Sequence, residues 1–270
     1  MGSPMPFVQP ELDSGRHRQP QSLKGDRRKR SSRRGAPNLE SFEAIVRRVV
    51  TKNDDRSSLV AEIACVVGAE ILEGVLAPGS DINSVELARR FRTSRTPARE
   101  AVLLLEKESL VEVLPRRRPR VASLSVVEIR EIYRVRGALL GMIAGEVAEH
   151  RTETGIAELR AIFGTMESAA ECGRRDSYFW ANVAFHELLA EQSGNKTLQR
   201  IIDSLMLPSL RLRRITLSMP ERIQQSVADH ARLIVALEDG DAELASALAK
   251  SNVLSALKLL ERLLAEPAAR

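Results

Sequence analysis

The chain is 270 residues long and carries 41 basic against 36 acidic residues, which gives a net charge of +5. This length suits two domains of ordinary size. The two cysteines, Cys65 and Cys172, lie far apart, which argues against a disulfide framework or a zinc ribbon and favours free thiols in a reducing compartment. No apolar run reaches the length of a membrane span, and the N-terminus lacks the apolar core of a signal peptide. We therefore expect a cytoplasmic protein that does not contact membranes.

Residues 1–56 are expected to form a basic N-terminal extension. Residues 1 to about 38 are rich in Pro, Ser, Gly and Arg and lack apolar periodicity. Such a composition cannot bury enough surface to offset chain entropy, so we expect this part to be disordered. Its arginines at 27–34 either lie along DNA phosphates or belong to a solvated tail. Apolar residues at helical spacing between Phe42 and Val50 predict a short helix within 39–56.

The segment 57–122 combines short helices with two short strands. Its pattern predicts helices from about 57 to 76, from Ser84 onward with Ser84 as N-cap, and from about Thr96 to Glu108, and strands near 111–114 and 120–122. Two helices joined by a four-residue turn and followed by an arginine-rich hairpin are the layout of a winged helix-turn-helix. Double-stranded DNA is therefore the expected partner of this segment.

The predicted DNA-binding residues follow from where the cationic and hydroxyl side chains fall. Ser94 and Pro97 suit the start of the third helix, and a helix that is cationic at its N-terminal end can enter a major groove. We expect Arg95 and Arg99 to contact base edges, and Ser94 and Thr96 to reach phosphates. The remaining candidates for backbone contact are Arg89 and Arg90 before the turn and Arg116, Arg117 and Arg118 at the wing tip. A solvated turn is the alternative interpretation of the wing-tip cluster.

From residue 123 to residue 265 the pattern is helical throughout. Ser125 and Glu128 form a predicted capping box at the start of a long helix that ends near His150. We expect the inward face of this helix to be formed by Ile129, Ile132, Val135, Leu139 and Met142. Further helices are predicted at about 155–172, 176–192, 197–217, 221–238 and 241–265. Six helices joined by short loops indicate a compact antiparallel bundle, so the fold class is mainly α with a small β wing.

The segment 57–122 resembles the DNA-binding domain of GntR-type bacterial transcription regulators. The resemblance is carried, in order, by P-G at 78–79, E-L-A at 86–88, S-R-T-P-x-R-E-A at 94–101 and L-x-x-E-x-L-V at 105–111. Arg92 and Ser109 stand where the family usually has glycine. The wing tip at 116–120 also lacks the glycine that usually turns it.

The second segment resembles the ligand-binding domain of the FadR-like branch of that family. Matching stretches are Ser123-Leu124-Ser125, Glu131 to Arg136, Phe185 to Leu189, Ser193-Gly194-Asn195 and His230 to Asp241. The resemblance implies an all-helical domain that dimerises and binds a small metabolite, commonly a carboxylate and often with a divalent metal ion. We expect a homodimer, because one recognition helix covers too few base pairs for genomic specificity, and the resemblance places the dimer contact largely in this domain.

The resemblance places the family's four metal ligands on Asn182, His186, His230 and Asn252. Here an amide stands in place of a carboxylate and another in place of an imidazole, and amide oxygens are weak ligands for transition metals. We therefore expect these four side chains to line a polar cavity that hydrogen-bonds an organic effector directly. Arg136 matches a pocket arginine of the family and would pair with a carboxylate. The alternative is that Arg134 and Arg136 are surface residues that flank the core face. A bound Zn, Ni or Mn ion, held by His186 and His230, is the alternative.

Catalytic motifs are missing from the sequence. His186-Glu187 begins like H-E-x-x-H, but Ala190 stands at the second histidine, and no P-loop, G-x-S-x-G or G-x-G-x-x-G occurs. We therefore expect no enzyme. The predicted function is a metabolite-responsive transcription regulator, a repressor of a catabolic or transport operon. The alternative is a constitutive or architectural DNA-binding protein whose helical domain only dimerises.

Overall fold

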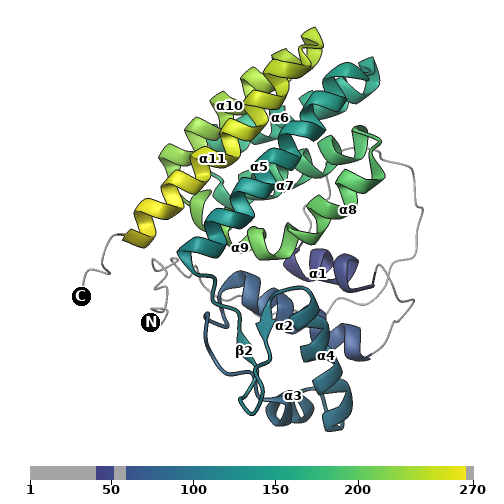
Figure 1. Ribbon diagram of the computed structural model, residues 1–270, viewed down its shortest axis with the longest axis vertical. Coiled ribbons are helices and arrows are strands. Elements are labelled where there is room, and N and C mark those ends of the chain that lie inside the picture. The colour runs from purple at the N-terminus through teal and green to yellow at the C-terminus, as the bar shows by residue number, and fades with distance from the viewer. Residues whose placement is uncertain (1–40, 52–58, 266–270) are drawn as a thin grey trace, which may run out of the picture.

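The protein is mainly α-helical and has two parts stacked along its longest axis (Figure 1). The computed structural model describes residues 41–51 and 59–265. The lower part is the winged helix-turn-helix domain and the upper part is the helical bundle. The segment from residue 1 to about residue 38, for which we expect disorder, lies outside the described residues.

The DNA-binding domain contains α2 (Leu59–Glu73), α3 (Ser84–Arg90), α4 (Arg95–Lys107), β1 (Val111–Glu112) and β2 (Arg120–Val121). The strands are antiparallel, with Val111 opposite Val121. They are shorter than their hydrophobic pattern predicts. The N-cap of α3 is Asn83 and not Ser84, because the Asn83 side chain accepts a hydrogen bond from the backbone N–H of Val85 at 2.9 Å.

Three residues of this domain adopt the left-handed backbone conformation although they are not glycine. Their φ angles are 51° for Arg92, 58° for Ser109 and 60° for Arg116. Two of these are the positions at which the family usually has glycine, and the third lies in the wing tip. The fold thus keeps the turns of the family while side chains occupy a region that costs them about 1 kcal/mol each.

The bundle contains α5 (Val126–Glu149), α6 (Glu153–Glu171), α7 (Arg175–Gln192), α8 (Lys196–Ser204), α9 (Met206–Thr216), α10 (Pro220–Asp239) and α11 (Ala242–Ala265). The capping box of Ser125 and Glu128 is present. The helix expected at 197–217 is two helices, interrupted at Leu205. Pro208 explains the break, because proline lacks an N–H and is tolerated only in the first turn of a helix.

Helices α5 and α11 pack against each other along their length, side by side in Figure 1. Gly141 permits the close approach, since a Cβ at this position would lie 3.1 Å from the Ser246 carbonyl oxygen. The predicted inward face of α5 is partly wrong. Ile129 is buried, but Val135 and Met142 are 49% and 55% exposed. The buried face is rotated toward the positions that include Tyr133 and Arg136, so a second apolar stripe stays on the surface.

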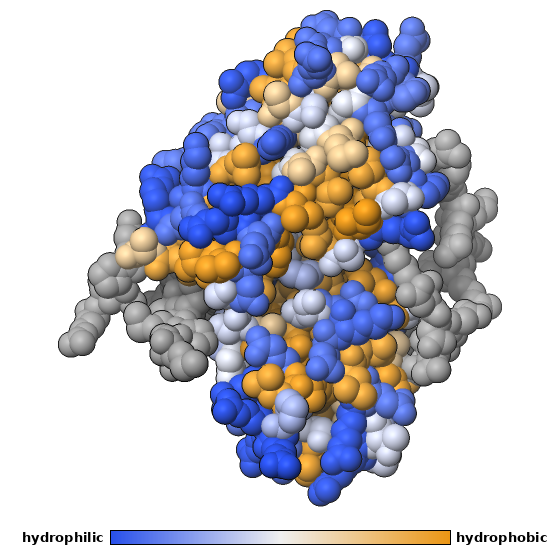
Figure 2. All heavy atoms as spheres, viewed as in Figure 1, coloured by the Kyte–Doolittle hydropathy of each residue, from blue (hydrophilic) through white to orange (hydrophobic). Residues whose placement is uncertain are grey.

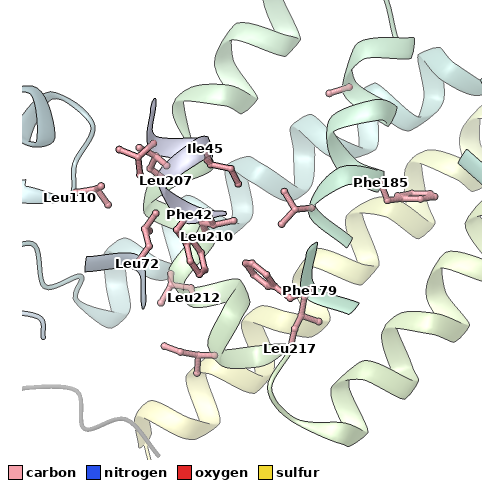
Figure 3. Close-up of a cluster of buried hydrophobic side chains, with 14 of the residues drawn as sticks. Phe42, Ile45, Leu72, Leu110, Phe179, Phe185, Leu207, Leu210, Leu212 and Leu217 are labelled. Carbon is pink, nitrogen blue, oxygen red and sulfur yellow. The ribbon is translucent and has the colours of Figure 1, made fainter. Parts of the chain in front are cut away.

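Helix α1 (Phe42–Thr51) lies between the two parts of the protein (Figure 1). It packs on α2, where a Cβ at Gly68 would lie 2.8 Å from Val46 Cγ1. Toward the bundle, the Phe42 ring lies 5.6 Å from the Phe179 ring and 4.8 Å from the Trp180 ring. Figure 3 shows Phe42 among side chains of both parts. A helix that precedes the DNA-binding domain therefore forms part of its junction with the bundle.

Candidate DNA-binding surface and effector pocket

The first turns of α4 present the predicted base-reading side chains to solvent. Arg95, Thr96 and Arg99 are exposed. Ser94 is the N-cap, but its side chain makes no capping hydrogen bond within the described residues, so the hydroxyl is available to a phosphate. The opposite face of α4 is held in the domain core by Ala98, Ala101, Val102 and Leu105. The helix is thus anchored along one side and cationic at the end that faces outward.

The other predicted backbone contacts fall into two groups. Arg89 and the wing-tip residues 116–118 are exposed. Arg90, in contrast, donates two hydrogen bonds to the Glu70 carboxylate, at 2.9 and 2.5 Å, and its guanidinium lies 5.3 Å from the centre of the Phe91 ring. This ion pair raises the pKa of Arg90 and holds its side chain against α2. Arg90 therefore has less freedom to reach a phosphate than Arg89.

Inside the bundle, the structure brings together all five of the predicted effector residues. Arg136 from α5, Asn182 and His186 from α7, and Asn252 from α11 line one polar pocket. His230 from α10 lies beside it, with its ring 5.3 Å from that of His186. The Asn182 amide nitrogen is 3.4 Å from His230 Nε2. Side chains more than a hundred residues apart in the chain thus converge in the core.

Tyr133, Arg213 and Arg222 also line this pocket, and the sequence did not identify them as pocket residues. Arg213 donates a hydrogen bond to Asn182 Oδ1 at 2.9 Å, and Arg222 donates one to Asn252 Oδ1 at 2.5 Å. Each asparagine that stands in for an expected metal ligand is therefore bonded to a buried arginine. Helical periodicity does not distinguish Arg213 from the adjacent arginines of α9. The two asparagines do give an indirect signal. If no metal ion binds their buried amide oxygens, hydrogen-bond donors must lie nearby.

Three buried guanidinium groups make the pocket strongly electropositive. Burial lowers the pKa of Arg213 to about 9, which leaves this side chain protonated at neutral pH. Burial also lowers the pKa of Arg136, and the Tyr133 phenol opposes this effect. The pKa of His186 is lowered well below its ordinary value by burial and then by the positive neighbours, so its ring is neutral. A desolvated positive pocket of this kind favours an anion.

Several polar atoms in the pocket are buried without a hydrogen-bond partner among the described residues. They are Tyr133 Oη, His186 Nδ1, and Arg222 Nε and Nη1. Buried donors left unpaired cost free energy, and a bound molecule with acceptor oxygens would satisfy them. The open volume of the pocket is only about 30 Å³. It therefore has room for a group of the size of a carboxylate or a water molecule unless side chains move.

The donor set does not fit a transition-metal ion. The oxygens of Asn182 and Asn252 already accept hydrogen bonds from arginines. His230 Nδ1 lies 2.7 Å from the Ser226 carbonyl oxygen, so it carries the proton and donates to that oxygen. Only histidine nitrogens remain as ligands, and three guanidinium groups would repel a cation. Within the part of the chain that the structure describes, no cluster of three His, Cys, Asp or Glu side chains suits a metal.

The length and polarity of the helices also bear on membrane insertion. Across residues 41–51 and 59–265, none of the helices combines the length and the apolar character that are needed to cross a bilayer.

Comparison with known proteins gives consistent results for both parts of the chain. A repressor named for a D-xylose utilization operon of Paenarthrobacter nicotinovorans is 29% identical over 72% of this chain and 85% of its own length. An HTH-type transcriptional regulator of Agrobacterium vitis is 34% identical over 44% of this chain and 71% of its own length. The solved structure of Escherichia coli McbR/YncC superposes with a TM-score of 0.63 at 22% identity, over 77% of this chain and 99% of that one.

Two family descriptions cover the domains described above. Residues 59–121 match the bacterial regulatory proteins of the gntR family, and residues 131–255 match the FCD domain. These ranges contain the exposed arginines of α4 and the polar pocket of the bundle, respectively. The chain therefore belongs to the GntR family of bacterial regulatory proteins, as a transcription regulator, and not an enzyme, in which an FCD domain follows the DNA-binding domain.

Proposed function

We propose that this metabolite-responsive regulator is a homodimeric repressor of a catabolic or transport operon, and that a small organic anion is its effector. The observation that carries the effector assignment is the cluster of Arg136, Arg213 and Arg222 in a pocket whose buried donors lack partners. The name of the relative from Paenarthrobacter supports the type of operon. Because its target is bacterial DNA, the protein would act in the cytoplasm.

On DNA, α4 would enter the major groove with its N-terminal end. Arg95 and Arg99 would read the edges of guanine bases, because a guanidinium can donate two hydrogen bonds to O6 and N7. Ser94 and Thr96 would bind phosphates near the helix N-terminus. Arg89 and the wing residues Arg116, Arg117 and Arg118 would neutralise backbone charge, and Arg90 would join them only after leaving Glu70.

In the bundle, a carboxylate of the effector would sit among the three guanidinium groups. Charge-assisted hydrogen bonds to arginine are stronger than neutral ones and often bidentate, so this arrangement selects planar oxyanions. Asn182 and Asn252 would hold Arg213 and Arg222 in place, while His186 and His230 would offer neutral hydrogen-bonding groups. In this proposal the arginines supply the positive charge that a metal ion supplies in other members of the family.

The exposed apolar stripe of α5 supports the homodimer. Val135 and Met142 are about half exposed, and Ile132 and Leu139 are partly buried beside them. Helix α8, which packs on α5, adds Ile201 at 43% exposure. Figure 2 shows hydrophobic residues gathered on this face of the bundle. A contiguous patch of this kind on a soluble domain typically marks an interface, and two copies would bury it.

The DNA-binding proposal is tested by selecting genomic fragments with the purified protein at about 150 mM salt, a concentration at which non-specific binding is weak. The Arg95→Ala/Arg99→Ala variant is compared with Ala157→Glu, which changes an exposed position of α6. We expect the wild type and Ala157→Glu to retain the same few palindromic fragments and the double variant to lose them. Broad retention by all three proteins would contradict specific recognition.

The dimer is tested by measuring the mass of the full-length protein in solution. Val135→Glu/Met142→Glu places two charges on the apolar stripe and should give monomers, whereas the Ala157→Glu control stays dimeric. If the α5 variant keeps the wild-type mass, the proposed interface is wrong.

The effector proposal is tested with the selected operator and a panel of small mono- and dicarboxylates. We expect one class to change operator affinity by about tenfold, which corresponds to a coupling of about 1.4 kcal/mol. Arg136→Gln should lose the response while it keeps operator binding. The small pocket volume favours one alternative, a constitutive DNA-binding protein. That alternative predicts operator binding that no carboxylate of the panel changes.

A further inference from the structure

A second cavity, of about 550 Å³, lies where the DNA-binding domain meets the bundle. Its walls come from the end of α2, from the start of α7 and the residues before it, and from the end of α9 and the residues after it. The lining residues are Leu72, Glu73, 173–177, Phe179, Arg211, Arg214, Ile215, Leu217 and Ser218. A volume of this size holds a complete metabolite, whereas the pocket around Arg136 has room for one small group. The two sites share Leu217 and no other lining residue.

The polar side of this junction cavity is cationic. Arg174, Arg175, Arg211 and Arg214 line it, against the acidic Glu73 and Asp176. Arg211 is the informative residue, because its Nε and Nη2 are buried and find no hydrogen-bond partner among the described residues. Burial lowers the pKa of Arg211. Arg211 lines the cavity, so an oxyanion that reaches its guanidinium would supply an acceptor in a charge-assisted hydrogen bond.

Helix α7 contributes a second, independent feature. Its N-terminus opens into the cavity, with Arg175, Asp176 and Ser177 in the lining. The N-cap is Arg174, which supplies no side-chain capping bond. The N–H of Arg175 already donates to the Gly173 carbonyl oxygen at 3.1 Å, so the N–H groups of Asp176 and Ser177, which line the cavity, are the first ones left for a ligand. Uncapped N–H groups and the helix dipole both favour an anion.

The remaining wall is apolar. It is formed by Leu72, Phe179, Ile215 and Leu217, and Figure 3 shows Leu72, Phe179 and Leu217 in the cluster that joins α2, α7 and α9. A fully hydrated anion such as free phosphate would leave this wall without a partner. A ligand with an anionic head and an apolar body would contact both the cationic and the apolar parts of the lining.

We propose that the junction cavity is a second ligand site, which binds an organic carboxylate with an apolar body and holds its head between Arg211 and the N-terminus of α7. The site lies outside the polar pocket of the bundle. Because α2 belongs to the DNA-binding domain and α7 and α9 to the bundle, such a ligand bridges the two. It would therefore restrict the orientation of the DNA-binding domain directly.

The test uses the full-length protein with hexanoate and benzoate as probes and with the neutral amides hexanamide and benzamide as controls. Thermal unfolding reports stabilisation of the native state. Trp180 is the only tryptophan of the chain and its ring lies 4.9 Å from that of Phe179, so hexanoate binding is also followed by Trp fluorescence. We expect a carboxylate to raise Tm by about 2–4 °C at saturating millimolar concentration, and its amide to have no effect.

Three variants identify the site. Arg211→Gln removes the unpartnered charge, and Ser218→Phe fills the cavity from its edge; both should abolish the Tm shift and the fluorescence change. Arg200→Gln, which removes an exposed arginine of α8, should respond as the wild type does. Arg136→Gln should also keep the response, because it alters only the bundle pocket. The proposal is overturned if the amides act as strongly as the acids, if Arg211→Gln binds hexanoate unchanged, or if only Arg136→Gln loses the response.

Discussion

Arg213 of α9 donates a hydrogen bond of 2.9 Å to Oδ1 of Asn182 on α7, at the position where the family resemblance implies a carboxylate that binds a metal ion. The two side chains are buried, and the guanidinium brings a fixed positive charge into the centre of the FCD domain. Arg222 and Asn252 repeat the arrangement on α10 and α11. At both positions where an asparagine stands in place of an expected metal ligand, its amide oxygen accepts a hydrogen bond from a buried arginine.

This pairing predicts the response to metal ions. Zinc or nickel should leave the Tm of the wild type unchanged, and so should Asn182→Asp alone, because Asp at this position pairs with Arg213. The triple variant Asn182→Asp/Asn252→His/Arg213→Met restores the four ligands and removes one of the three opposing charges, so zinc should raise its Tm and EDTA should reverse the effect. A zinc-dependent rise in the wild type that His186→Gln abolishes and His150→Gln keeps would contradict the prediction.

The DNA-binding half could be predicted from sequence because its signals are local. The turn before α4, the Ser94 cap position and the arginines that follow lie within one short segment, and their exposure depends on little else. The pocket depends on contacts between distant helices. The resemblance located Asn182 and His186, but it gave no reason to assign Arg213 to the core, since helix periodicity alone leaves adjacent arginines equivalent.

The wrong inward face of α5 has a related cause. Hydrophobicity selected Val135 and Met142, which are apolar but form a surface stripe, over Tyr133 and Arg136, which are polar but buried around the pocket. When a helix has two apolar stripes, the hydrophobic pattern alone does not tell which stripe packs in the core and which stays exposed. The packing of α1 on the bundle could not be predicted from the sequence either, because it depends on ring contacts of Phe42 with Phe179 and Trp180.

The buried histidines predict a loss of stability in mild acid. Burial lowers the pKa of His230 to about 4, against 6.5 in the unfolded chain, and the pKa of His186 is lowered in the same direction. Their contribution is complete above pH 6.5 and is lost as the pH falls toward 4, because the unfolded chain takes up the protons first. For His230 the loss is roughly 3 kcal/mol. Urea unfolding between pH 7.5 and 4.5 measures it.

The control for this prediction is a variant that cannot titrate in the core. His186→Gln/His230→Gln should unfold with a flatter pH dependence than the wild type between pH 6.5 and 4.5. His150→Gln, at an exposed helix end, should keep the wild-type slope. Equal slopes for all three proteins would show that the buried rings do not couple folding to protonation.

The left-handed residues predict where glycine stabilises the fold. Ser109 follows the C-cap of α4 with φ 58°, and its side chain is exposed. Ser109→Gly should raise the free energy of unfolding by about 0.5–1 kcal/mol, because glycine reaches this conformation without strain. Ala161→Gly, at an exposed interior position of α6, should lower it by about 1 kcal/mol. A loss of stability in both variants would mean that Ser109 carries no strain.

An ion pair and a buried aromatic ring attach α1 to the bundle. Arg48 donates to both carboxylate oxygens of Glu187, at 3.2 and 2.6 Å, but the two side chains are 38% and 27% exposed. Solvent screens such a pair, so a double-mutant cycle of Arg48→Ala and Glu187→Ala should give a coupling of only about 0.5–1 kcal/mol.

Phe42 should matter more than this ion pair. It is 2% exposed, contacts the rings of Phe179 and Trp180, and lies under the Arg214 guanidinium at 5.0 Å. Phe42→Ala removes a buried ring at the domain junction and should cost about 3–5 kcal/mol. It should also expose Trp180 and shift its emission to longer wavelength, which Arg48→Ala should not do. A larger loss for Arg48→Ala than for Phe42→Ala would reverse this order and make electrostatics the main attachment of α1.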